Sequence, residues 1–305
     1  MKKYCFLFAL ISSTSLLFGQ TNYQANHYMF NQQLVNPASI GKDYKVKTGL
    51  ITNSSLTGIT GAPRYIGFHI SSPIKLSNAF VGLNVSSVSF GVRNQTEFTG
   101  IYSYRLTGKK WSLTVGLQAS GVSLGVNNNQ LKTGGAGDEQ YLKSSSGFGY
   151  NVGSGVYAAN SNSFIGVSIP SVLTNVMESN GDLSSDYIHD GFPIFISAGH
   201  EGQLNKNWWL NPYAMLRYYP SGGNVLDLNL MVAYRNNVWA GPFYKYGSQL
   251  GMMLGCDLNS FVKFSYAGGI SQHHNTGFTG STHEVSLLFV IKDKDVQTFN
   301  SLRFF

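Results

Sequence analysis

Period-two alternation of apolar and polar residues is the feature that most constrains the fold of this chain. Between Trp111 and Ser120, every second residue is apolar and the intervening ones are Ser, Thr, Gly or Gln. In an extended strand, this alternation puts the apolar side chains on one face and the polar ones on the other. About fourteen segments follow the pattern, at residues 45–56, 63–72, 79–90, 95–106, 110–122, 147–158, 162–169, 191–202, 207–219, 224–235, 237–246, 247–257, 260–270 and 282–292.

The length and composition of these segments indicate where the apolar faces lie. Most segments reach the roughly 9–11 residues with which a tilted strand crosses a bilayer. Charged residues make up only 11% of the chain, whereas soluble domains carry about 25%. Hydrocarbon tolerates no open sheet edge, so strands that cross it must close into a ring. We therefore predict an all-β fold, a transmembrane antiparallel outer-membrane β-barrel of about 14 strands formed by residues 45–292.

The connections between the predicted strands provide a second signal. Every second connection is short and polar, as at Gly108-Lys109-Lys110 and Asn205-Lys206-Asn207. The others are more variable, and those at 123–146, 170–190 and 271–281 are long. Outer-membrane barrels have short periplasmic turns and longer external loops. The short connections are therefore predicted to face the periplasm, and an even strand number puts both termini there.

The tryptophans agree with this orientation. All four follow a short connection at the start of a predicted strand, where aromatic residues are enriched at a membrane interface. The alternative is that they are core aromatics of a soluble sandwich. We predict a periplasmic aromatic girdle formed by Trp111, Trp208, Trp209 and Trp239.

The N-terminus resembles an export signal. Lys2 and Lys3 precede an apolar stretch from Tyr4 to Phe18, and cleavage after Gly19 would leave Gln20 first. The alternative is a short membrane anchor. Residues 1–19 are thus predicted to be a cleaved signal peptide, and the protein is predicted to lie in the outer membrane of a Gram-negative-type cell. The mature chain would keep a single cysteine, Cys256, so it could form no internal disulfide.

Residues 20–44 differ from the strands and carry a motif that resembles a known family. Pro37 fixes its own φ and favours an extended Asn36, and Gly41 can adopt a positive φ. These features predict either a plain turn or a compact periplasmic, plug-like segment under or inside the barrel. The segment resembles the opening motif of the PorP/SprF family, outer-membrane proteins of the type IX secretion system and gliding machinery, and it matches at Tyr28, Met29, Phe30, Asn31, Asn36, Pro37, Ala38 and Gly41.

The resemblance implies a non-enzymatic protein that needs no cofactor or metal. It would help the secretion machine export or anchor a large adhesin-like cargo, whose C-terminal region would bind the external loops. A periplasmic tail at 293–305 ends in Arg303, Phe304 and Phe305. This tail is predicted either to dock onto a periplasmic ring or adaptor protein or to serve as an assembly signal.

Parts of the sequence also fit other functions. An Asn-Pro-Ala near the N-terminus is also similar to the hatch of FadL-type barrels, so a FadL-like channel for small hydrophobic solutes is the alternative function. A soluble secreted β-sandwich adhesin is a third class. The net charge is +7 without a basic run, which does not support nucleic-acid binding.

Three sequence patterns could carry catalysis or metal binding, but each lacks a feature that such a site requires. Gly121-Val122-Ser123-Leu124-Gly125 has the spacing of a nucleophile elbow but continues from a strand rather than starting a helix. His273 and His274 are adjacent, so in a strand they would point to opposite faces. For a lipid-facing hydrolase, His69 and His200 lie in strands, but no serine stands out.

Overall fold

The computed structural model describes residues 25–40, 44–75, 77–128, 144–178, 192–220, 223–235, 237–272 and 279–292. Within these ranges, the only helices are three short 3₁₀ turns: η1 (Asn26–Met29), η2 (Gln32–Leu34) and η3 (Pro37–Ser39). No helix in the described part of the chain is both long and apolar enough to span a membrane. The remaining elements are strands, in chain order β1 (Tyr44–Thr57), β2 (Arg64–Pro73), β3 (Ala79–Phe90), β4 (Arg93–Thr107), β5 (Ser112–Val126), β6 (Ser145–Ala159), β7 (Ser163–Glu178), β8 (Ile194–His200), β9 (Gly202–Gln203), β10 (Trp208–Tyr218), β11 (Val225–Tyr234), β12 (Val238–Lys245), β13 (Gln249–Asp257), β14 (Val262–Gln272) and β15 (Thr279–Lys292).

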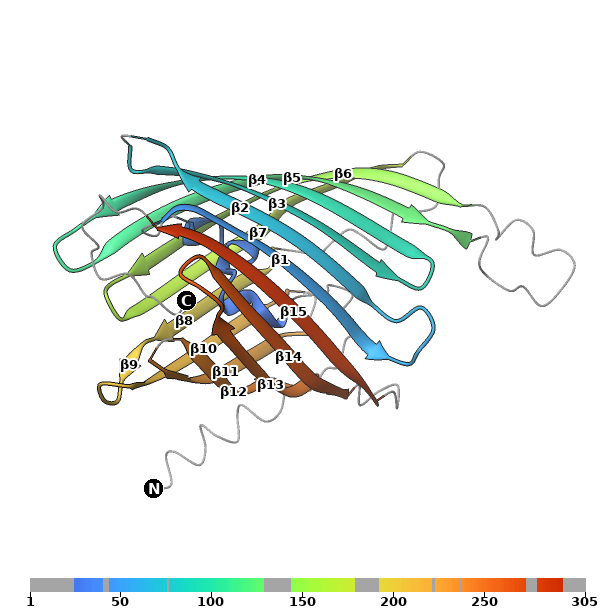
Figure 1. The fold of residues 1–305 in the computed structure, drawn as a ribbon. Coiled ribbons are helices and arrows are strands. Elements are labelled where there is room, and N and C mark those ends of the chain that lie inside the picture. The colour runs from blue at the N-terminus through green and yellow to red at the C-terminus, as the bar shows by residue number, and fades with distance from the viewer. Residues whose placement is uncertain are drawn as a thin grey trace, which may run out of the picture.

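The strands form one closed antiparallel barrel (Figure 1). Each strand pairs with its neighbours in sequence, and β1 pairs with β15, so the first and last strands meet. The two-residue β9 continues β8 along the same partner, β10, beyond the break at Glu201. The wall therefore has fourteen strand positions, as the sequence predicts.

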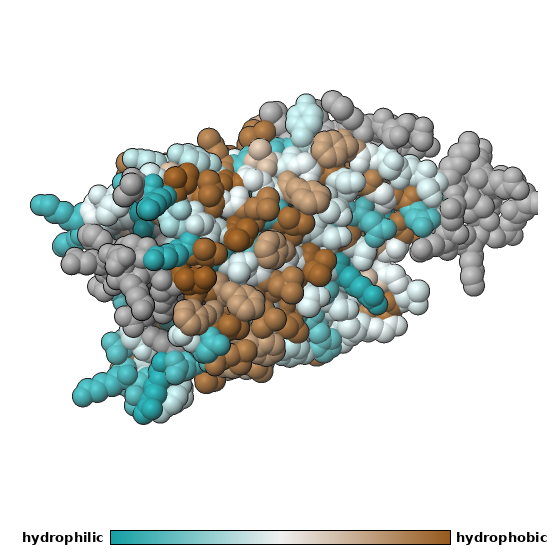
Figure 2. All heavy atoms as spheres, turned by 45° about the horizontal axis from the view of Figure 1, so that its top comes forward, coloured by the Kyte–Doolittle hydropathy of each residue, from teal (hydrophilic) through white to brown (hydrophobic). Residues whose placement is uncertain are grey.

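Side chains alternate across this wall as the sequence pattern requires. On β5, Leu113, Val115 and Leu117 point outward and are 41–56% exposed, while Thr114 points inward and is 3% exposed. Figure 2 shows hydrophobic side chains gathered over the middle of one face, with hydrophilic ones toward its two ends. The outer surface is thus apolar where a bilayer would contact it, because a strand buries its polar face inside the barrel.

Several strands extend beyond their predicted ends. The connection predicted at 123–146 is shorter, because β5 continues to Val126 and β6 begins at Ser145. The prediction of a connection at 170–190 is wrong for residues 170–178, since β7 runs to Glu178. Pro170 interrupts the sequence pattern there without ending the strand. The pairing of β6 with β7 instead shifts register between Val152 and Ser154, and this irregularity accommodates the proline.

Candidate functional site

The segment 25–40 lies inside the barrel, where its three 3₁₀ turns form the dark-blue coils within the ring of strands (Figure 1). Every residue of this segment except Leu34 is buried, and the motif residues Met29 and Asn31 are fully enclosed. Gly41 lies outside the described residues. The motif residues that the structure describes as buried are Tyr28, Met29, Phe30, Asn31, Asn36, Pro37 and Ala38.

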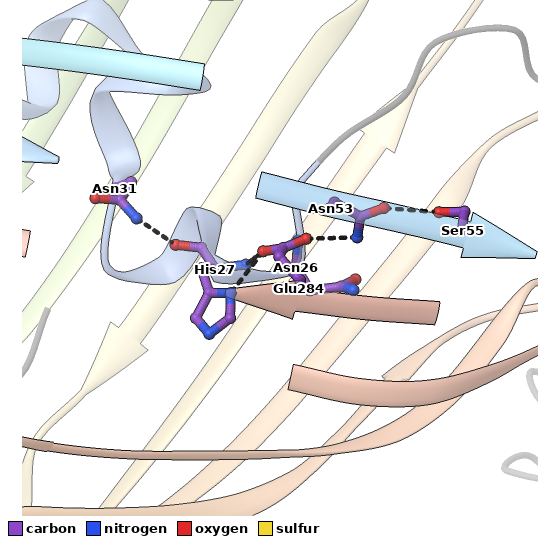
Figure 3. A network of polar contacts seen from close by, with 6 residues as sticks. All are labelled: Asn26, His27, Asn31, Asn53, Ser55 and Glu284. Atoms are coloured by element: carbon purple, nitrogen blue, oxygen red, sulfur yellow. Dashed lines mark hydrogen bonds and ion pairs between the residues drawn. The ribbon is translucent and has the colours of Figure 1, made fainter. Parts of the chain in front are cut away.

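A carboxylate on the last strand holds the start of this segment (Figure 3). Glu284 on β15 accepts hydrogen bonds from the backbone N–H groups of Asn26 and His27, both at 2.7 Å. The Nδ1 atom of His27 lies 2.6 Å from Oε1 of the same carboxylate. Because an ionised carboxylate only accepts, this ring nitrogen is the donor. Asn53 on β1 donates to Glu284 at 2.9 Å, so the carboxylate links the segment to both strands of the seam where the barrel closes.

Asn36 fixes the middle of the segment against β6 and β7. Its Oδ1 accepts from Ala38 N at 2.9 Å and caps η3, while Nδ2 donates to the carbonyls of Val156 at 3.2 Å and Val167 at 3.4 Å. One step earlier, Ser168 donates to the carbonyl of Val35 at 2.6 Å. The side-chain amide of Asn36 therefore caps its own turn through the oxygen and binds the barrel wall through the nitrogen.

Glycines on the inner wall make room for this turn. A Cβ on Gly116 would collide with the backbone of Pro37 and Ala38, and a Cβ on Gly155 would collide with Oδ1 of Asn36. On β7, a Cβ on Gly166 would lie 2.9 Å from Nδ2 of Asn36. Three adjacent strands thus present a bare backbone surface where Asn36-Pro37-Ala38 packs.

Further polar contacts tie the segment to other strands. Gln33 and Asn84 bond reciprocally: Gln33 Nε2 donates to Asn84 Oδ1 at 2.7 Å, and Asn84 Nδ2 donates to Gln33 O at 3.2 Å. The Lys47 ammonium donates to the carbonyl of Phe30 at 2.7 Å. Together with Glu284 and Asn36, these contacts hold the segment from widely separated parts of the ring.

An aromatic cluster packs the segment against the opposite wall. Tyr28 meets Tyr213 edge-on with ring centroids 5.4 Å apart, and Phe30 lies 5.5 Å from Trp239. Asn229 on β11 donates to the Tyr28 hydroxyl at 3.0 Å. Burial first, and then the charge of Asp227, raise the pKa of the Tyr28 phenol well above its usual range. The hydroxyl therefore stays protonated and packs as a neutral group.

Two charged residues on the inner faces of neighbouring strands form a buried ion pair. Arg217 Nη2 lies 2.7 Å from Asp227 Oδ2, and both side chains are almost fully enclosed. Lys245 is buried on β12, and its neighbour across the ladder is Asp227. Arg93 and Arg235, by contrast, are exposed. Arg235 lies over the outward ring of Tyr234, 5.3 Å from its centroid.

The predicted tryptophan girdle needs correction. Trp111 and Trp208 point outward and are exposed at the end of the barrel that carries the short connections. Trp239 points inward, is 4% exposed and contacts Phe30. Trp209 also lies on the inner face of its strand, packed against the interior cluster. A run of two tryptophans must place one on each face, and the phase of β12 places Trp239 inside, so neither Trp209 nor Trp239 can belong to a lipid-facing girdle.

The residues of the catalytic patterns do not come together in one site. Gly121-Val122-Ser123-Leu124-Gly125 lies within β5 and is not on an elbow. His69 is buried on β2, and its ring nitrogens have no hydrogen-bond partner among the described residues. His200 does have a serine beside it: Ser163 Oγ lies 2.8 Å from His200 Nδ1, and both side chains are near the outer face. Sequence reasoning missed this pair, because it joins two strands.

The remaining predicted site residues lie outside the described part of the chain. These are Gly41, the tail with Arg303, Phe304 and Phe305, and most of the connections predicted at 123–146 and 170–190. His273 and His274, which the sequence does not favour as a metal site, also lie outside the described residues. Among the described residues, no three His, Cys, Asp or Glu side chains gather as a metal site would require.

Comparisons with known proteins place this geometry in context. A family model described as "Type IX secretion system membrane protein PorP/SprF" matches residues 17–289. The comparison with curated proteins found no match.

Solved structures of outer-membrane barrels share the fold. The Acinetobacter baumannii outer membrane protein Omp33 is 7% identical, with a TM-score of 0.50, and the match covers 82% of this chain and 100% of that one. The Ralstonia pickettii toluene transporter TbuX is 11% identical, with a TM-score of 0.52 over 85% of this chain and 92% of that one. The CymD monoaromatic hydrocarbon channel is 11% identical, with a TM-score of 0.50, and the match covers 90% of this chain and 95% of that one. At such identities the likeness is one of fold alone.

Proposed function

Because the chain belongs to the PorP/SprF family of type IX secretion system membrane proteins, we propose that it assists the secretion or surface anchoring of one large adhesin-like cargo protein. The family is one of type IX secretion system membrane proteins, and the fold resembles those of outer-membrane barrels. The observation that carries the proposal is the extent of the family match, which includes the interior segment as well as nearly the whole barrel. In this role the protein catalyses no reaction.

The way the interior segment is held supports a platform rather than an open conduit. Residues 25–40 bond to Glu284 on β15, Asn84 on β3 and Ser168 on β7. A segment with anchors spread around the ring braces the wall. We propose that it acts as a plug, so that the cargo uses the outer rim of the barrel and does not pass through its centre.

The cargo and the machine would meet the protein at opposite ends. The C-terminal region of the cargo would bind the external connections around 123–146 and 170–190, whose Gly, Ser and Asn content suits adaptable hydrogen bonding. On the periplasmic side, the tail ending in Arg303, Phe304 and Phe305 would dock onto a ring or adaptor protein, unless it is an assembly signal. Export would remove residues 1–19 by cleavage after Gly19, which N-terminal sequencing of the mature protein tests directly.

The decisive experiment deletes the gene and restores it with defined variants. The proposal predicts that deletion abolishes surface display of one large secreted protein, leaves uptake of small hydrophobic solutes unchanged, and is complemented by the intact gene. A pull-down from detergent-solubilised membranes should recover that cargo or a ring component. Display of every surface protein at normal levels in the deletion strain would contradict the proposal.

The tail is tested separately from the barrel. A chain truncated after Lys292 is compared with one in which only Phe304 and Phe305 become alanine. If the tail docks onto the machine, the truncated chain assembles in the membrane but does not support display. If it is an assembly signal, both variants fail to reach the outer membrane.

The alternative function is a FadL-like channel for small hydrophobic solutes. Under this alternative, the deletion strain would lose uptake of such solutes and keep its surface proteins. The same strain therefore separates the two functions.

A further inference from the structure

The hydrogen-bond ladder of the barrel wall is interrupted twice at one level. Between β8–β9 and β10, pairing runs to Tyr213 opposite Gly199 and resumes at Leu210 opposite Gly202, so Asn211 and Pro212 are skipped. Between β11 and β12, pairing skips Leu230 and Met231. The skipped residues of β10 and β11 face each other, since Pro212 pairs with Leu230. The two gaps therefore flank one two-stranded strip of the wall.

Two prolines explain the gaps. Pro212 lies opposite the end of β8, and Pro242 on β12 lies where the ladder with Leu230 is skipped. Neither residue has a backbone N–H to donate to the ladder. A Cβ on Gly241 would collide with the carbonyl oxygen of Leu230, so glycine leaves the space into which this carbonyl turns.

A cavity of about 610 Å³ lies at this level of the wall, within the roughly 300–1,000 Å³ range of ligand pockets. It is lined by residues with outward side chains, among them Leu228, Leu230 and Tyr244, and by residues whose side chains point inward and are buried, among them Phe164, Tyr213 and Phe243. In a continuous sheet these two sets lie on opposite faces. The inward residues are almost fully buried, so the cavity is a hollow of the outer face whose floor is the wall at the two gaps.

We propose that this cavity binds one acyl chain of a membrane phospholipid, which enters from the bilayer between β8 and β12. The cavity continues the apolar outer surface, so hydrocarbon is the medium at its mouth. At its end nearest the short connections, Ser163 and His200 form a polar pair at 2.8 Å that can bond ester or phosphate oxygens.

The charge at that end of the barrel favours a phospholipid over a neutral oil. Exposed cations lie on the short connections, and every acidic side chain described by the structure is buried or half-buried. Anionic phosphates of a leaflet lie at this depth and are attracted to such cations. The exposed cations of the short connections are Lys75, Lys109, Lys110, Lys206 and Arg235.

The test uses the full mature chain in lipid nanodiscs that contain phosphatidylethanolamine with a diazirine midway along one acyl chain. After illumination, peptides are mapped for attached lipid. The site predicts labelling concentrated on 212–214 and 228–230, about tenfold above equally outward positions such as Leu83 and Val115, which corresponds to 1.4 kcal/mol. Labelling spread evenly around the barrel would overturn the proposal.

Two matched substitutions sharpen the result. Ala198→Trp places an indole in the cavity mouth, whereas Ala240→Trp places one on the outer face away from the lining. The first should abolish the enrichment and the second should leave it unchanged; equal labelling of both variants would contradict the site. If Ala198→Trp does not assemble, the labelling pattern of the unaltered chain still decides the question.

Discussion

The Nδ1 atom of His27 lies 2.6 Å from Oε1 of Glu284, a residue 257 positions further along the chain. Glu284 is fully buried on the strand that closes the barrel against β1. Its two oxygens also accept both backbone amides at the start of η1 and the Asn53 amide. One carboxylate thus joins the interior segment to the closing seam, so the position of this segment and the closure of the barrel are coupled.

Replacing Glu284 should weaken the barrel and loosen the segment. Glu284→Gln puts an amide donor where three N–H groups and a ring nitrogen now find an acceptor. Hydrogen bonds to a charged group contribute about 1.5–3 kcal/mol each, so the temperature at which the protein unfolds on a heat-modifiability gel should fall clearly. Glu97→Gln, at a half-buried position on β4, is the matched control and should change it little. Equal behaviour of the two variants would remove Glu284 from this role.

A single methyl group at Gly116 should displace the interior segment. Gly116→Ala would press a Cβ into the backbone of Pro37 and Ala38, whereas Gly100→Ala adds a methyl on the outer face with no close neighbour. Overpacking of this kind costs about 1–3 kcal/mol. Limited proteolysis should cut within residues 25–40 of the first variant only. An uncut Gly116→Ala segment would show that the segment does not pack on this wall.

The buried ion pair should matter more than the exposed one. Asp227→Asn leaves Arg217 and Lys245 enclosed without their carboxylate, and breaking a buried pair costs about 3–5 kcal/mol. Asp257→Asn removes a partly exposed partner that lies 3.5 Å from Lys263, for which about 0–1 kcal/mol is expected. Urea unfolding from liposomes measures both changes. A larger loss at Asp257 would contradict the burial of the Arg217–Asp227 pair.

A charge introduced on the outer surface should destabilise the barrel more at the middle of the bilayer than near its edge. Leu117 lies in the middle of β5 and Leu106 lies near the end of β4, and both point outward. Arginine at the bilayer midplane costs about 2–4 kcal/mol and about 0–1 kcal/mol near an interface. Leu117→Arg should therefore lower the yield of folded barrel in vesicles much more than Leu106→Arg. Equal yields would show that this face does not contact lipid.

The sequence predicts the wall better than it predicts the contents of the barrel. The alternation from Trp111 to Ser120 marks β5 without any tertiary information, because the two faces of each strand meet different surroundings. The same alternation cannot show that Glu284 is the anchor of His27, since that contact joins the two ends of the chain. The one hint in the sequence is that Glu284 is a charged residue at a position of the last strand that the alternation places inside the barrel.

Trp239 and Pro212 show two further limits of the sequence. Position after a short turn predicts the depth of Trp239 but not its face, and the face depends on the phase of a strand with only eight residues. Pro212 and Pro242 are visible in the sequence as ladder breakers. Only the strand register, in which Pro212 pairs with Leu230, shows that the two gaps in the hydrogen-bond ladder lie at the same height in the wall.

Hydrogen exchange of the backbone amides of residues 26–40, measured on the mature protein in lipid nanodiscs, tests the central claim most directly. The amides of Asn26 and His27 bond to a buried carboxylate, and those at Asn31, Leu34 and Asn36 bond within the segment. We predict that these amides exchange as slowly as those of the flanking strands, and that Glu284→Gln releases the amides of Asn26 and His27 first. Exchange at the rate of an unstructured peptide throughout residues 26–40 would contradict it.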